Sequence, residues 1–130
     1  MAKWNRDRFW SRWLDQRGFL YCELAGHERG CSSGFEAHHI IPRHLVRGNK
    51  KALAFIHKHD YIFLASLCPA HHAIASTWEV RYILLDARVL MFGEAVSHAV
   101  SGLLDLTKSD VPELHRYLEA SDDLESPRCP

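Results

Sequence analysis

The chain carries two dense histidine clusters, Glu36-Ala37-His38-His39-Ile40-Ile41-Pro42 and Leu67-Cys68-Pro69-Ala70-His71-His72. Adjacent side chains point to opposite faces of a strand, and on a helix they diverge by about 100°. The two histidines of each pair are therefore suited to two different tasks. The clusters predict two sites, one built from sulfur and His71 and the other from the remaining three histidines.

Sulfur and imidazole at the first of these sites are typical zinc ligands. Cys68 and His71 have the spacing of half a tetrahedral zinc site, and Cys22 and Cys31 can supply the other half. In a reducing cytoplasm, metal binding explains such cysteines better than a disulfide does. The step from Cys22 to Cys31 is longer than the usual roughly two to four residues between ligands. His27 is therefore an alternative to Cys31 as the fourth ligand.

Composition places the chain among ordinary globular proteins. Its 130 residues are 47% hydrophobic and 25% charged, which excludes wholesale disorder. No apolar run approaches the roughly 18 residues of a membrane span, and the N-terminus lacks the apolar core of a signal peptide. We expect a single domain without membrane contact, in the cytoplasm of a bacterium or encoded by a phage in its host.

Periodicity and punctuation predict an α+β protein. Apolar residues spaced by three and four predict an amphipathic helix over 4–17. Strands are expected over 35–41 and 61–67, and a helix is expected to open at Pro69 and to run beyond Ile74. Residues 43–60 are expected to form a long loop with one short helical piece near 52–57. Further helices are expected over 78–92, 94–106 and 112–120.

At these residues the chain resembles the HNH endonucleases, whose core is a ββα-metal finger. Residues 36–43 are similar to the first strand of that family, with its His-Ile-x-Pro signature. Residues 67–73 are similar to its closing Cys-x-x-Cys-His step, with His71 in place of the second cysteine. The resemblance covers residues 20–78 and implies a ββα-metal core with a structural zinc site. The flanking parts of the single domain 1–130 are a basic helix (1–18), a helical C-terminal portion (79–120) and a tail expected to be disordered (121–130).

The resemblance also implies a role for each matched residue. His38 and His72 correspond to ligands of a catalytic divalent ion, and His39 corresponds to the general base. An imidazole with an ordinary pKa near 6.5 can take a proton from water at physiological pH. An ion held by two imidazoles keeps coordination positions free for phosphate and water. The sequence leaves Mg²⁺, Mn²⁺, Ni²⁺ and Zn²⁺ as alternatives for this ion. The structural Zn²⁺ ligands implied by the resemblance are Cys22, Cys68 and His71.

Two positions depart from the family pattern. Ala25 stands where the second cysteine of the first knuckle is expected, and this departure brings Cys31 into the ligand set. Phe63 stands where the family has an Asn that helps to orient the general base. Asp60, three residues earlier, is the substitute that the sequence offers.

Basic residues indicate where DNA is expected to bind. Residues 1–20 hold five basic against two acidic residues, whereas residues 101–130 hold three against seven, so the net charge of zero hides a gradient. Trp4, Trp10 and Trp13 can be interpreted as base-stacking residues, but their helical spacing favours the core. The expected phosphate contacts are Arg6, Arg8, Arg12, Arg17, Arg43, Arg47, Lys50 and Lys51.

The predicted function is metal-dependent hydrolysis of DNA phosphodiester bonds by an HNH-type endonuclease. One alternative is a zinc-stabilised nucleic-acid-binding module that has lost activity with the missing Asn. Another is a structural or regulatory phage protein that uses the finger as a scaffold. Retention of His38, His39 and His72 favours catalysis, because a scaffold requires the zinc ligands alone. Besides DNA, the partners considered are a second copy, through residues 78–120, and a phage packaging or host protein.

Overall fold

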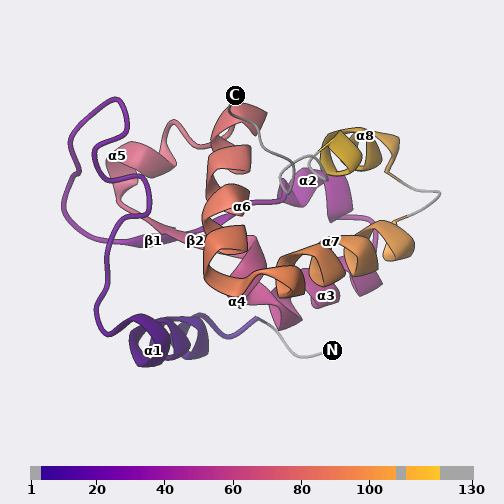
Figure 1. Cartoon of the computed structure of the whole chain (residues 1–130), viewed down its shortest axis with the longest axis horizontal. Helices are drawn as coiled ribbons and strands as arrows, with labels where there is room; N and C mark the ends of the chain where they lie inside the picture. Colours follow the sequence, from indigo (N-terminus) through magenta and orange to yellow (C-terminus); the bar gives the residue numbers. More distant parts are fainter. Residues whose placement is uncertain (1–3, 108–110, 121–130) are drawn as a thin grey trace.

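The computed structural model describes residues 4–107 and 111–120 of the chain. It is an α+β structure in which helices surround a two-stranded antiparallel sheet (Figure 1). The strands are β1 (Glu36–His39) and β2 (Leu64–Leu67), and His39 lies opposite Leu64 in their register. The disorder expected for 121–130 concerns residues outside those described.

The N-terminal helix α1 (Arg6–Arg17) agrees with the predicted amphipathic helix. The Asn5 side chain accepts a hydrogen bond from the backbone N–H of Arg8, which caps the first turn. Gly18 ends the helix in the left-handed conformation with φ 85°, which favours glycine. Phe9 and Trp13 are buried and attach the helix to the core.

Between the strands the chain is largely helical, so the helical piece expected near 52–57 is confirmed, whereas the long loop expected around it is wrong. It forms α2 (Arg43–Val46), α3 (Lys50–Lys58) and α4 (Asp60–Phe63). Asn49 caps α3, and the fully buried Ala52 and Ile56 give this helix an apolar face among its basic residues. Fully buried helices and fully buried strands both have apolar sequences. The apolar run 61–67 therefore does not indicate that α4 ends and β2 begins at Leu64.

The C-terminal helices have the predicted bounds: α6 (Trp78–Phe92), α7 (Glu94–Leu106) and α8 (Pro112–Ala120). The helix that opens at Pro69 is short, α5 (Pro69–His72), so the expected continuation beyond Ile74 is wrong. Gly102 of α7 permits close contact with α3, because a Cβ at that position would lie 2.7 Å from Cζ of Phe55. In Figure 1 the sheet and α5 lie at one end of the molecule and α8 at the other, with α6 between them.

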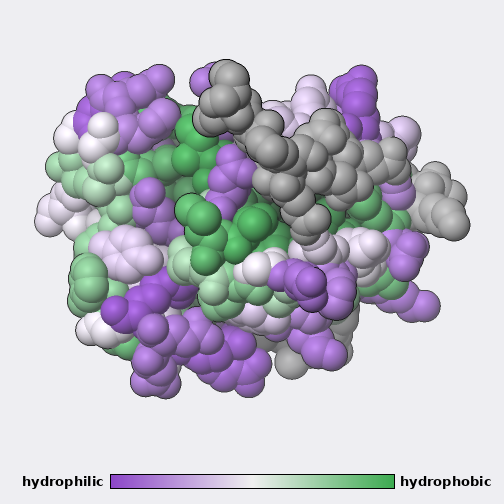
Figure 2. Space-filling model, viewed as in Figure 1, coloured by the Kyte–Doolittle hydropathy of each residue, from purple (hydrophilic) through white to green (hydrophobic). Residues whose placement is uncertain are grey.

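Some apolar side chains of α6 stay on the surface. Ile83, Leu90 and Met91 are exposed, and Figure 2 shows hydrophobic surface over this helix. The homodimer expected through residues 78–120 remains a prediction. None of the described helices is long and apolar enough to cross a membrane.

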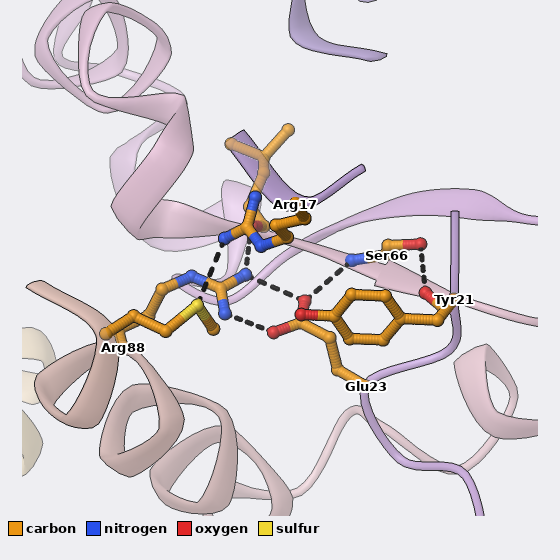
Figure 3. Close-up of polar contacts among 7 residues, drawn as sticks. Arg17, Tyr21, Glu23, Ser66 and Arg88 are labelled. Carbon is orange, nitrogen blue, oxygen red and sulfur yellow. Dashed lines mark hydrogen bonds and ion pairs between the residues drawn. The ribbon is translucent and has the colours of Figure 1, made fainter. Parts of the chain in front are cut away.

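A buried ion pair connects α6 to the loop after α1 (Figure 3). Both terminal nitrogens of Arg88 donate to the Glu23 carboxylate, and Nη2 also donates to the carbonyl of Leu64 at 2.6 Å. The backbone N–H of Ser66 donates to the same carboxylate at 2.8 Å. Arg88 is fully buried, so its positive charge depends on Glu23 for compensation.

Replacing Glu23 tests this dependence. Glu23→Gln keeps the shape of the side chain but leaves the Arg88 charge buried and uncompensated, so we expect the free energy of unfolding to fall by about 3–5 kcal/mol. The control is Glu79→Gln at an exposed position of α6, which should change it by no more than about 0.5 kcal/mol. Urea denaturation followed by circular dichroism measures both, and equal stabilities would show that the ion pair is dispensable.

Candidate functional site

Four side chains from separate segments place their ligand atoms together. Cys22 and Cys31 lie in the loop between α1 and β1, Cys68 follows β2, and His71 lies in α5. All four ligand atoms lie within 4.8 Å of one another. Nδ1 of His71 is 3.4, 3.6 and 3.2 Å from Sγ of Cys22, Cys31 and Cys68 respectively. A tetrahedral zinc ion places neighbouring sulfur and nitrogen ligands roughly 3.5 Å apart, so this Cys3His cluster can hold a metal such as zinc.

The second nitrogen of His71 fixes the orientation of its ring. Nε2 lies 3.0 Å from the carbonyl oxygen of His27. Because a carbonyl accepts and never donates, Nε2 carries the proton and Nδ1 presents its lone pair to the sulfur atoms. His27 thus contributes its backbone to the cluster, and the fourth ligand position is filled by Cys31.

The surroundings of the sulfur atoms favour thiolates stabilised by a cation. Burial raises the pKa of the Cys68 thiol, but hydrogen bonds from the backbone of His71 and Ser32 outweigh it and bring the pKa to about 5. At Cys31, burial and hydrogen bonds with the thiols of Cys68 and Cys22 raise the pKa to about 11. Three sulfur atoms this close can all be thiolates only with a positive ion between them.

The other three histidines of the two clusters, His38, His39 and His72, line a cleft of about 860 Å³. The rings of His38 and His72 lie with their centroids 5.0 Å apart at 70°. Nε2 of His38 is buried and has no hydrogen-bond partner. Nδ1 of His72 lies 2.8 Å from Oε1 of Glu36, an arrangement in which a carboxylate orients a metal-binding imidazole. In each ring, one nitrogen therefore has no hydrogen-bond partner among the described residues.

Burial keeps the two histidines of β1 uncharged. It lowers the pKa of His38 to about 3 together with the charges of Arg81, His72 and His39. Burial also lowers the pKa of His39 to about 4, with contributions from nearby charges that begin with Arg43. Neutral imidazole is the form that binds a metal ion or accepts a proton.

His39 has a neighbour that the sequence does not indicate. Nε2 of His57, from α3, lies 3.1 Å from Nε2 of His39. Phe63, at the position of the family's Asn, is fully buried in the core. Asp60 accepts hydrogen bonds from Trp4 and Arg12. The residue in contact with the predicted base is thus His57, near the end of α3, to which the sequence analysis assigns no role.

The basic residues predicted to contact DNA divide into two groups. Arg6, Arg43 and Arg47 line the cleft, as does Arg81, which the sequence does not indicate. Glu36 is the one acidic residue among the described residues of its wall. Four guanidinium groups against one carboxylate make the cleft suitable for a polyanion.

The other basic residues do not line the cleft. Arg12 forms an ion pair with the buried Asp60, with 2.7 Å between Nη2 and Oδ1. The guanidinium carbon of Arg17 lies 3.6 Å from the centroid of the Trp13 ring. The guanidinium groups of these two arginines thus contact other parts of the protein, and the phosphate contact expected of them stays a prediction. Arg8, Lys50 and Lys51 are exposed outside the cleft wall.

Of the three tryptophans, one packs in the core and two lie where base stacking is possible. Trp13 is 2% exposed and belongs to the core. Trp4 and Trp10 are half-buried and line the cleft. Trp4 stacks on His57 with centroids 5.6 Å apart and an angle of 26° between the planes. One edge of the cleft is therefore aromatic and adjoins the predicted base.

Zinc content tests the Cys3His cluster. Purified protein is expected to hold about one zinc ion per chain, and Cys31→Ser to lose it during dialysis against a mild chelator, because one of four ligands is removed. His27→Ala is the matched control, since only its backbone carbonyl takes part, and it should retain the zinc. Metal analysis of the dialysed proteins gives the answer. Zinc loss from His27→Ala with retention in Cys31→Ser would reverse the ligand assignment.

Stability at acid pH tests the buried histidines. In the unfolded chain His38 titrates near 6.5 and in the folded protein near 3, so the stability present above pH 6.5 is lost as the pH falls. Between pH 6.5 and 5 this amounts to about 2 kcal/mol. His38→Gln should show a flatter dependence of unfolding free energy on pH than the parent, measured without added divalent ions. His98→Gln, at an exposed position of α7, should follow the parent. If the free energy of unfolding of His38→Gln depended on pH as steeply as that of the parent, His38 would not be the source of this pH dependence.

Comparison of the chain with models of protein families, with curated proteins and with solved structures finds no match. The chemistry of the Cys3His cluster and of the cleft therefore has to be inferred from the arrangement of their side chains.

Proposed function

We propose that the protein is a metal-dependent nuclease of the HNH type that hydrolyses phosphodiester bonds in DNA. The observation that carries this proposal is the meeting of His38, His39 and His72 in one arginine-lined cleft. The order of β1, β2 and α5, with the Cys3His cluster beside them, supports a ββα-metal finger as the core.

Two histidines would hold the catalytic ion. His38 offers a buried Nε2 without a partner, and Glu36 orients His72 through its Nδ1. A divalent ion bound there would polarise a phosphate oxygen and stabilise the charge on the leaving group. An imidazole pair suits Zn²⁺, Ni²⁺ or Mn²⁺ better than Mg²⁺.

His39 would act as the general base, held in place by His57. Both rings are neutral at physiological pH, so one of the two facing Nε2 atoms donates and the other accepts. His39 has a free lone pair when it donates from Nε2 to His57, and its Nδ1 then accepts the proton of the attacking water. His57 would thus perform the orienting task that Asn has in the family.

The arginines would hold the DNA by its backbone. Arg6, Arg43 and Arg47 project from α1 and α2 into the cleft, where they can contact phosphates on either side of the reacting one. Contacts of this kind give affinity without sequence preference.

One observation favours a second candidate function. The family's Asn position is a core phenylalanine, Phe63, so the protein can be a zinc-stabilised module that binds nucleic acid without cleaving it. The cleft and its arginines would then serve binding alone.

A plasmid-cleavage assay with Mg²⁺, Mn²⁺, Ni²⁺ and Zn²⁺ in turn separates these functions. We expect cleavage by the parent protein and a loss of roughly 10²–10⁴-fold in the rate for His39→Ala, because the proton acceptor is removed. His98→Ala, on the surface of α7, should cleave like the parent. DNA binding without cleavage by the parent, whichever ion is added, would establish the binding module instead.

A further inference from the structure

Arg81 is a buried cation without a carboxylate partner. Two arginines of the described residues are buried, and the other, Arg88, is compensated by Glu23. Arg81 is 6% exposed, and no carboxylate among the side chains described in residues 4–107 and 111–118 lies within ion-pair distance of it. Burial alone lowers its pKa, to about 10, so the side chain still carries its charge at pH 7. A buried charge of this kind is costly unless a counter-charge accompanies it.

Backbone carbonyls hold the guanidinium in one orientation. Nη1 donates to the carbonyl oxygens of His39 and Ile40 at 2.8 and 2.6 Å, and Nε donates to that of Ser76 at 3.2 Å. These contacts join α6 to the end of β1. They involve dipoles and not charges, so they fix the position of the cation without neutralising it.

The fixed cation lies at the wall of the cleft. Arg81 lines it together with His38, His39 and His72, and its charge contributes to the lowered pKa of both β1 histidines. Nη2 forms no hydrogen bond with the described residues and is not among their buried unsatisfied atoms. A donor that is free at the cleft, on a rigid guanidinium, is suited to a phosphate oxygen.

We propose that Arg81 is the phosphate-binding residue at the centre of the cleft, and that it binds a phosphodiester of a nucleic-acid strand beside His38 and His39. The identification of that phosphate as the one to be cleaved rests on the proposed nuclease function. The contact itself requires only that the cleft binds a nucleic-acid backbone. The counter-charge that no described residue supplies at Arg81 then comes from its ligand.

Salt-dependent DNA binding tests this role separately from cleavage. The affinity of a fluorescent 16-base-pair duplex is measured by anisotropy over a series of salt concentrations, in a His39→Ala background without added divalent ion. In that background Arg81→Gln should weaken binding roughly tenfold or more. It should also reduce the slope of log affinity against log salt by about 0.9, the value for one phosphate contact. Arg116→Gln, on α8 and away from the cleft wall, should leave both quantities unchanged.

An unchanged slope for a folded Arg81→Gln protein would overturn the proposal, because Arg81 would then only join α6 to β1. Circular dichroism and zinc content establish that the variant is folded. If the variant does not fold, the side-chain ¹⁵N resonances of Arg81 are measured in the His39→Ala protein instead. The dinucleotide pTpT should shift these resonances. No shift at saturating pTpT would overturn the proposal. Absence of cleavage with all four ions would contradict the nuclease function and leave these binding results unaffected.

Discussion

The buried ion pair between Glu23 and Arg88 is the interaction on which the arrangement of the two sites depends. It joins residues 65 positions apart and, through Ser66 and Leu64, fixes the loop after α1 against β2. Cys22 adjoins Glu23 and is thereby placed opposite Cys68. Since a buried guanidinium cannot give up its charge, the helix that supplies it is an integral part of the domain. The C-terminal helices, which show no resemblance to the HNH family, thus help to build the metal cluster.

Two structural devices couple the Cys3His cluster to the cleft. His71 and His72 are neighbours in the short helix α5, and they face the sulfur atoms and Glu36 respectively. A metal ion bound to His71 therefore also fixes the position of His72. Arg81 and Arg88 lie seven residues apart on α6, which places them on the same face two turns apart. One holds the end of β1 and the other holds the loop, so α6 sets the distance between the two sites.

Local patterns predict the parts of the protein whose signals are contained in a few residues. The helices after residue 78 are bounded in the sequence by Gly93 and Pro112 and have apolar faces, and the spacing of Cys68 and His71 identifies half of the metal cluster. The change from α4 to β2 is hidden because both elements are buried and apolar. His57 could not be identified as the neighbour of His39, since this requires knowing that α3 folds beside β1. The ion pair of Arg12 with Asp60 could not be predicted either, because it too depends on the tertiary structure.

The electrostatics of the cleft explain why its histidines and arginines are found together. The arginines attract a phosphate backbone, and their charges also help to keep His38 and His39 neutral. In the proposed nuclease, these positive charges would repel a divalent ion from the cleft as long as no substrate is bound. A phosphodiester bound to Arg81 removes part of that repulsion, and the ion in turn favours the phosphodiester, so each ligand raises the affinity for the other. In this proposal Arg81, which has no carboxylate partner among the described side chains, would bind the substrate, and Nε2 of His38, which accepts no hydrogen bond from them, would bind the ion.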